Sequence, residues 1–113
     1  LKYWPITKPG ESYSNTKKRL GEKEGCFSHI RLHGQRPATT LTANLRTLTH
    51  WKYPRGLNFN EVKRLGSFPD DYQAKNDKIG KYMIGMSVPP KMTEQVARAV
   101  CQQWLGVSYD SRP

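Results

Sequence analysis

Cysteine is scarce in this 113-residue chain, which contains only Cys26 and Cys101. Two cysteines cannot build the disulfide framework that stabilises many small secreted domains, so we expect free thiols and an intracellular, cytoplasmic location. The chain also lacks an apolar run long enough to cross a bilayer, and its first residues do not have the pattern of a signal peptide. Because the first residue is Leu1 rather than Met, we expect a fragment or a processed product.

The common catalytic motifs are absent as well. The sequence has no P-loop, no G-x-G-x-x-G, no G-x-S-x-G and no H-E-x-x-H. Asp70 and Asp71 are adjacent after a proline, where carboxylates more often shape a turn than act as a catalytic pair. Cys26, His29 and His33 have zinc-like spacing, but a structural zinc site needs four ligands. We therefore expect neither a catalytic residue nor a metal site in this chain.

Basic residues, in contrast, are abundant. Nineteen Lys and Arg against nine Asp and Glu give a net charge of +10. Such a surface attracts polyanions, and nucleic acid is the first partner that it suggests. A solvated basic face without a partner, or one that docks on an acidic subunit, is the alternative. The run Lys17-Lys18-Arg19 lies in residues 1–25, which we expect to be loop, and it is either a phosphate-contacting loop or an ordinary exposed charge run.

The middle of the chain has the alternation of β-strands. Residues 27–32 predict a short strand. Residues 38–49 predict a second strand, because Leu41, Ala43 and Leu45 repeat at period two among threonines. A chain of this length forms one domain, so we expect a single α+β domain with a modest core.

Two helices follow in the expected fold. Asn58 and Glu61 have the form of a capping box at the start of a short helix over residues 58–65. Residues 73–80 are polar and predict a loop. After a stiff Gly-Met-Ser-Val-Pro-Pro turn, a C-terminal amphipathic helix is expected from Pro90 to Leu105. Its apolar stripe consists of Met92, Val96, Val100 and Trp104.

Three blocks together resemble the DNA (cytosine-5) methyltransferase family. "RGLNFNEVKRLGSFPDDY" at residues 55–72 is similar to the family's penultimate conserved block, and "YMIGMSVPPKMTEQVARAV" at residues 82–100 to its last block. "RPATTLTA" at residues 36–43 resembles part of its target recognition domain, and "KPGES" at residues 8–12 recurs in many members. The matching residues of the penultimate block are Arg55, Glu61, Arg64, Phe68, Pro69 and Asp70.

The resemblance implies a part of a known enzyme. Family members transfer a methyl group from S-adenosyl-L-methionine to carbon 5 of a cytosine that is flipped out of the duplex. Their nucleophilic Pro-Cys, Glu-Asn-Val and Phe-x-Gly-x-Gly segments, from the large catalytic domain, are absent here. The chain then corresponds to a partial domain of an S-adenosylmethionine-dependent α/β methyltransferase, and we expect it to be inactive alone.

The resemblance also divides the chain. Residues 1–54 would be the later part of the recognition domain, and residues 55–80 the block that organises it, with Arg55, Glu61 and Arg64 in charge-assisted hydrogen bonds. The third division, residues 81–105, is the turn and helix that pack on the catalytic domain. A tail follows at residues 106–113.

Site residues follow from charge and from the resemblance. Double-stranded DNA is the expected ligand, and its candidate contacts are Lys17, Lys18, Arg19, Arg31, Arg36, Thr40, Arg46 and Lys52. The expected cofactor side comprises Gly85, Met86, Ser87 and Val88. Met86 stands where the family usually has Asn, so a side-chain hydrogen bond to S-adenosyl-L-methionine cannot be made in the usual way.

The expected protein partner is the catalytic domain or subunit of the same methyltransferase. An uncovered apolar stripe on the last helix would also permit self-association of the isolated chain. The alternative is a non-catalytic DNA-binding or regulatory module that kept the recognition half and lost the enzyme, which the departure at Met86 favours.

Overall fold

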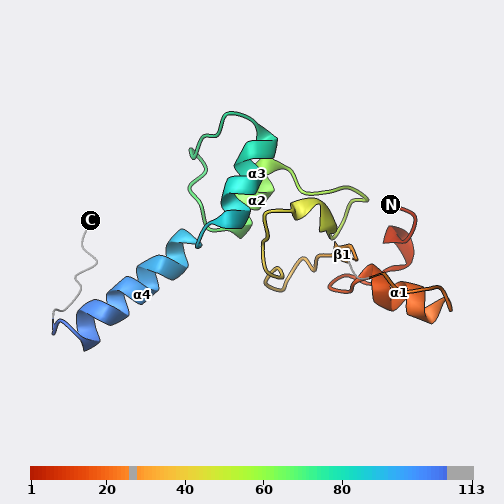
Figure 1. The fold of residues 1–113 in the computed structure, drawn as a ribbon, viewed down its shortest axis with the longest axis horizontal. Coiled ribbons are helices and arrows are strands. Elements are labelled where there is room, and N and C mark those ends of the chain that lie inside the picture. The colour runs from red at the N-terminus through yellow and green to blue at the C-terminus, as the bar shows by residue number, and fades with distance from the viewer. Residues whose placement is uncertain (26–27, 107–113) are drawn as a thin grey trace.

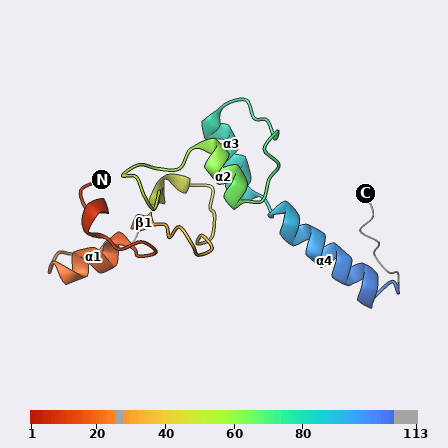
Figure 2. The same ribbon diagram turned by 180° about the vertical axis from the view of Figure 1, so that it is seen from behind.

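The computed structural model describes residues 1–25 and 28–106 (Figures 1 and 2). Short elements follow one another along an extended molecule of 57 × 32 × 23 Å. Its radius of gyration, 17.7 Å, exceeds the roughly 13 Å typical of a compact domain of this size. In Figure 1, α1 lies toward one end of the long axis and α4 toward the other, with α2 and α3 between them.

The N-terminal segment is more helical than expected. It contains the 3₁₀ turn η1 (Trp4–Ile6) and the helix α1 (Tyr13–Arg19), so the prediction of a loop over residues 1–25 is wrong for these residues. The helix forms because it can bury one face: Tyr13 and Thr16 are buried, and the hydroxyls of Thr16 and Thr7 lie 2.8 Å apart. The run Lys17-Lys18-Arg19 therefore occupies the last turn of a helix.

The sheet is smaller than the alternation suggested. It consists of β1 (Ile30–Arg31) and β2 (Leu48–Thr49), which pair in parallel with Ile30 opposite Leu48. Part of the strand expected over residues 27–32 is thus present, although Phe27 lies outside the described residues. Isolated bridges join Ile30 to Ser12 and Thr49 to Gly56.

The strand expected over residues 38–49 is present only at β2, and the prediction is wrong for Leu41, Ala43 and Leu45. Leu45 begins the 3₁₀ turn η2 (Leu45–Thr47), because the Asn44 side chain accepts a hydrogen bond from the Arg46 backbone N–H. The backbone just before it has another neighbour: a Cβ placed on Gly85 would lie 2.1 Å from the Thr42 carbonyl oxygen. A helix end, rather than a neighbouring strand, therefore packs against this segment.

Helix α2 (Phe59–Leu65) confirms the expected capping box. The Asn58 side chain accepts from the Glu61 backbone N–H at 2.8 Å, and the Glu61 carboxylate accepts from the Asn58 backbone N–H at 2.9 Å. Gly66 forms the C-terminal cap, as expected.

Helix α3 (Asp77–Met86) takes up residues 77–80 of the expected loop and the first two residues, Gly85 and Met86, of the expected Gly-Met-Ser-Val-Pro-Pro turn, so the prediction is wrong for these residues. The Asn76 side chain caps it by accepting from the Ile79 backbone N–H at 2.9 Å. Gly80 and Ile84 are its buried residues, and a Cβ on Gly80 would lie only 2.5 Å from the Phe59 ring. This polar segment can pack as a helix because Gly80 lets the Phe59 ring of α2 approach the α3 backbone.

Helix α4 (Pro90–Gln103) lies within the span expected for the C-terminal helix. None of its residues is buried, and Figures 1 and 2 show it projecting away from α2 and α3. The hydrophobic core lies elsewhere and joins the sheet to α2 and α3. Its buried members are Leu32, Leu45, Leu48, Leu57, Val62 and Ile84.

Candidate functional site

The start of α2 carries the most strongly perturbed carboxylate. Arg55 donates two hydrogen bonds to Glu61, from Nη1 to Oε2 at 2.9 Å and from Nη2 to Oε1 at 2.7 Å. This bidentate contact, together with the backbone N–H of Asn58, lowers the pKa of Glu61 to about 2. The charge-assisted pair therefore fixes the loop before α2 to the first turn of the helix.

His50 extends this cluster into the interior. Its side chain is buried, and its Nε2 lies 3.6 Å from Glu61 Oε1. Its Nδ1 accepts hydrogen bonds from the backbone N–H groups of Lys52 and Tyr53 at 3.0 and 3.2 Å. Burial lowers the pKa of His50, although Glu61 opposes that effect. Because Nδ1 accepts both hydrogen bonds, a neutral ring carries its proton on Nε2, the nitrogen near Glu61, and the 50–55 loop is held around the ring.

A second ion pair lies at the other end of α2. Arg64 donates from Nε and Nη2 to the two oxygens of Asp70 at 3.2 and 3.3 Å, and each residue shifts the pKa of the other toward its charged form. Beside it, Lys63 is buried and donates to the carbonyl oxygens of Asp70 and Tyr72 at 2.6 and 3.4 Å. The motif spacing suggested Arg64 and Asp70, but it gave no sign that Lys63 points inward.

The segment expected on the cofactor side begins as the last turn of α3. Gly85 packs directly on the Thr42–Ala43 backbone, where any side chain would collide. The Ser87 hydroxyl donates to the Ile84 carbonyl oxygen at 2.8 Å and closes the helix. Met86 and Val88 are exposed by 65% and 59%. Gly85 and Ser87 thus have internal structural contacts, whereas the side chains of Met86 and Val88 are available to a partner.

Arg31, a candidate DNA contact, is used inside the protein. Its Nε and Nη2 donate to the Trp51 carbonyl oxygen at 3.0 and 2.8 Å, and its Nη1 donates to the Thr7 carbonyl oxygen at 2.9 Å. The guanidinium carbon also lies 3.8 Å from the centre of the Trp4 ring. Arg31 therefore ties the N-terminal segment to the 50–55 loop, and its donors are already occupied.

The remaining candidates do not form one surface patch. Lys17 lies over the Tyr3 ring and Arg19 pairs with Glu11. Both are on α1, at the end of the molecule opposite α4 (Figure 1). Lys18 is exposed on the same helix. Four further candidates are exposed on the loops around the sheet and on η2, namely Arg36, Thr40, Arg46 and Lys52.

Arg46 lies in a cleft of about 520 Å³ between η2 and α3. The α3 wall contributes Lys78 and Lys81, which sequence reasoning missed because it assigned residues 73–80 to a loop and gave no weight to the cations there. Their separation of three residues, which places two side chains on one face of a helix, was the available signal.

Metal binding and membrane insertion find no support in the described part of the chain. Residues 1–25 and 28–106 contain no group of three His, Cys, Asp or Glu side chains arranged to hold a metal ion, and Cys26 lies outside those residues. No described helix has the length and apolar character needed to cross a membrane.

Comparison with known proteins finds a DNA methylase family and several methyltransferases. A family model described as C-5 cytosine-specific DNA methylase matches residues 4–102. The type II methyltransferase M.BbvI of Brevibacillus brevis is 37% identical over 100 residues, which cover 82% of this chain and 26% of that protein. The type II methyltransferase M1.HphI of Haemophilus parahaemolyticus is 34% identical over 73 residues, covering 64% of this chain and 20% of that protein.

A shorter relative differs in coverage. The type II methyltransferase M.AquIB of Picosynechococcus is 29% identical over 104 residues, which cover 79% of this chain and 75% of that protein. The matched region thus spans about a quarter of M.BbvI, a fifth of M1.HphI and three quarters of M.AquIB. No solved structure matches the chain.

Proposed function

The chain belongs to the C-5 cytosine-specific DNA methylase family, and from this premise we propose that it is the C-terminal part of a DNA cytosine-5 methyltransferase, as a fragment or a separate subunit. In this proposal the chain binds duplex DNA and completes the cofactor side of the enzyme. Methyl transfer from S-adenosyl-L-methionine requires the catalytic segments that this sequence lacks. The isolated chain then transfers no methyl group.

The observation that carries this proposal is the family match over residues 4–102 in a sequence without the Pro-Cys and Phe-x-Gly-x-Gly segments. The coverage of the relatives supports it, since the matched region is about a quarter of M.BbvI and three quarters of the short relative M.AquIB. A separate chain of this extent is therefore compatible with the family.

The fold supports two separate roles within the chain, DNA reading near α2 and docking by α4. The Arg55–Glu61 and Arg64–Asp70 pairs brace the two ends of α2, whose core contacts lead to the sheet. In the proposal this braced region presents the DNA-reading loops, and phosphate contacts position the duplex. Helix α4 leaves the region as an exposed amphipathic helix and docks on the catalytic part.

The net charge of +10 supports DNA as the ligand. A protein that neutralises phosphates releases counterions, so the affinity of the chain for duplex DNA should fall steeply between about 50 and 200 mM salt. Fluorescence anisotropy with a labelled duplex measures this dependence. An affinity that is unchanged over that range would contradict the DNA-binding half of the proposal.

A non-catalytic regulatory module is the second candidate, and Met86 is the observation in its favour. The exposed thioether offers only a weak acceptor where the family usually has an amide. In an enzyme reassembled with a catalytic part, Met86→Asn should raise the affinity for S-adenosyl-L-methionine if the chain completes a cofactor site. Equal affinity for the two forms, measured by calorimetry, would favour the regulatory module.

A further inference from the structure

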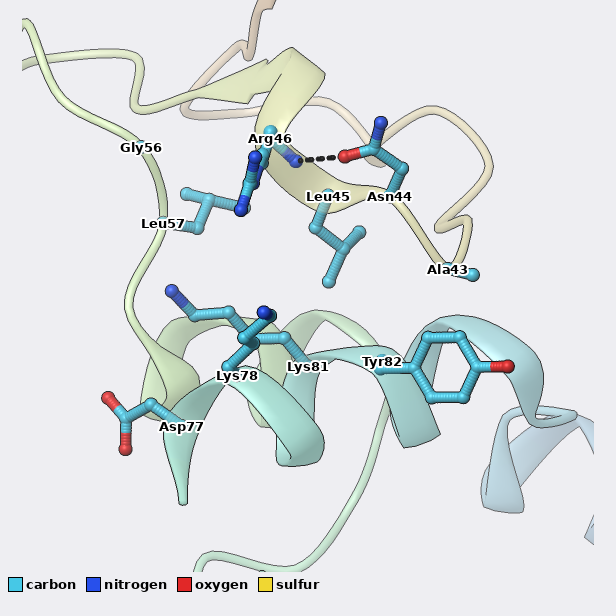
Figure 3. A pocket seen from close by; sticks show the side chains of 10 residues that line it. All are labelled: Ala43, Asn44, Leu45, Arg46, Gly56, Leu57, Asp77, Lys78, Lys81 and Tyr82. Carbon is cyan, nitrogen blue, oxygen red and sulfur yellow. Dashed lines mark hydrogen bonds between the residues drawn. The ribbon is translucent and has the colours of Figure 1, made fainter.

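We infer that the cleft between η2 and α3 binds a backbone phosphate of duplex DNA through Arg46, Lys78 and Lys81. The inference rests on the proposed DNA-binding function and adds a site to it, since Lys78 and Lys81 come from the helix that leads toward the last conserved block. Figure 3 shows the side chains of these residues at the cleft between the two walls.

Most basic side chains near the core have an internal role, and these three do not. Arg31, Lys63 and Arg55 donate to carbonyl or carboxylate oxygens at distances between 2.6 and 3.4 Å. Within residues 1–25 and 28–106, no side chain or carbonyl accepts a hydrogen bond from the charged groups of the cleft residues Arg46, Lys78 and Lys81. Three cations with unused donors at one cleft are arranged for an external anion.

The electrostatics of the cleft favour that anion. Lys78 and Lys81 are three residues apart on α3, and like charges at this spacing repel each other. Asp77 is the cleft's carboxylate, and Figure 3 shows its side chain turned away from Arg46. Asp77 is also in the first helical turn, where a carboxylate interacts favourably with the helix dipole. The three cations therefore keep an excess of positive charge that a phosphate would neutralise.

The walls of the cleft are held in place by the core. The Asn44 side chain caps the 3₁₀ turn that carries Arg46. Gly85 rests on the Thr42–Ala43 backbone, which fixes α3 against the same segment. Leu45 and Leu57 are buried members of the core and also line the cleft. The cations are thus presented by two elements whose separation is set by packing, while a phosphate can enter from the open side.

A phosphodiester fits this site better than a base or an apolar ligand. Lysine ammonium groups bind phosphate as point charges, and an arginine fork can contact two phosphate oxygens. All three charged side chains are donors only, so among base edges they suit chiefly the paired acceptors of guanine, whereas every nucleotide offers them a phosphate. We therefore expect the cleft to add affinity without sequence preference.

The test compares two double variants with the same net charge. Lys78→Gln/Lys81→Gln removes the α3 cations, and Lys75→Gln/Lys91→Gln removes two exposed lysines that do not line the cleft. Anisotropy with a labelled duplex gives the slope of log K against log[salt] for each protein. Loss of one phosphate contact should reduce the magnitude of that slope by about 1 in the cleft variant. The control should keep the slope of the unmodified chain, and circular dichroism checks that both variants are folded.

Three outcomes would overturn the inference, and together they distinguish its failure from a failure of the proposed function. Cleft and control variants with equal slopes, while the unmodified chain binds DNA steeply, would reject the cleft alone. An unmodified chain that binds no DNA would reject both the cleft and the DNA-binding proposal. Shifts of the amide resonances at Arg46 and Lys81 with inorganic phosphate, but an unchanged DNA slope, would assign the cleft to free phosphate instead. Arg46→Gln should reproduce the loss from the opposite wall.

Discussion

Helix α3 packs one face on other parts of the chain, whereas α4 has no buried residue. Gly80 and Ile84 of α3 are buried against α2 and the core. On α4, Val96 is exposed by 58%, and Trp104, which follows the last helical residue, is exposed by 82%. We propose that this exposed apolar face is a contact site. The difference teaches that the apolar stripe of α4 was enough to predict the helix. The stripe does not reveal which surface covers it.

Among the substitutions considered, one at the contact between α3 and the Thr42–Ala43 backbone should lower the free energy of unfolding most. The Cβ added by Gly85→Ala would lie 2.1 Å from a backbone oxygen that cannot rotate away. We expect the free energy of unfolding to fall by about 3 kcal/mol, despite the better helix propensity of alanine. Urea denaturation measures it, with Gly25→Ala as control, because a Cβ on Gly25 meets nothing within 4 Å. Equal midpoints for both variants would show that α3 is not held at this point.

A matched valine pair compares the two regions directly. Val62 in α2 is fully buried, and Val96 in α4 is mostly exposed. Val62→Ala should lower the free energy of unfolding by about 2 kcal/mol, because it leaves a cavity. Val96→Ala should change it by less than about 0.5 kcal/mol. A similar loss from both would mean that α4 packs on a partner even in the isolated chain, as in a self-associated form.

A matched glutamate pair makes the same comparison for charge. Glu61 accepts two hydrogen bonds from Arg55 and one from a backbone N–H, whereas Glu94 pairs with Arg98 along the exposed face of α4. We expect Glu61→Gln to lower the free energy of unfolding by about 1.5 kcal/mol. The value expected for Glu94→Gln is about 0.3–0.5 kcal/mol. Thermal unfolding of the two variants checks the order, and a larger effect at Glu94 would reverse the comparison.

Acidification should lower the free energy of unfolding through two groups, Glu61 and His50. The pKa of Glu61 is about 2 in the folded chain against an ordinary 4.5, so its contribution is present above pH 4.5 and is lost as the pH falls toward 2. Burial lowers the pKa of His50 from 6.5, with support from Arg55 and Lys52 and opposition from Glu61. A lowered pKa favours neutral His50 in the fold, so stability begins to fall below pH 6.5.

His50→Asn separates the two contributions, because asparagine retains an acceptor and does not titrate. The variant should lose less stability than the unmodified chain as the pH falls below 6.5. Urea midpoints across the range measure this difference. A midpoint that rises on acidification from pH 7 to 5 would contradict the neutral state assigned to His50.

Local signals predicted part of this structure. The capping box at Asn58 and Glu61, the proline-initiated C-terminal helix and the motif arginines involve residues close in sequence, so spacing alone reveals them. The missed helices depend on distant contacts. In α3, Gly80 allows the Phe59 ring to approach the helix, and Gly85 packs on the Thr42–Ala43 backbone that precedes η2. Those contacts cannot be read from the local polarity of residues 73–80.

In the candidate site, too, sequence-local contacts could be predicted and distant contacts could not. Family-like spacing identified Arg55, Glu61, Arg64 and Asp70, whose pairs lie within six residues along the chain. Charge alone could not separate Arg31, whose donors are satisfied inside the protein, from Arg46, whose guanidinium lines an open cleft. The distinction depends on which carbonyl oxygens the fold brings near each guanidinium, and that is a property of tertiary structure.

The most direct test of the proposed role is a methyl-transfer assay with two parts. One part is this chain, and the other is M.BbvI of Brevibacillus brevis shortened by the segment that this chain matches. Transfer of labelled methyl groups from S-adenosyl-L-methionine to duplex DNA is measured for each part and for the mixture. Activity is expected in the mixture only. Methyl transfer by this chain alone, or a stable complex of the two parts that binds DNA and transfers nothing, would contradict the role proposed for it.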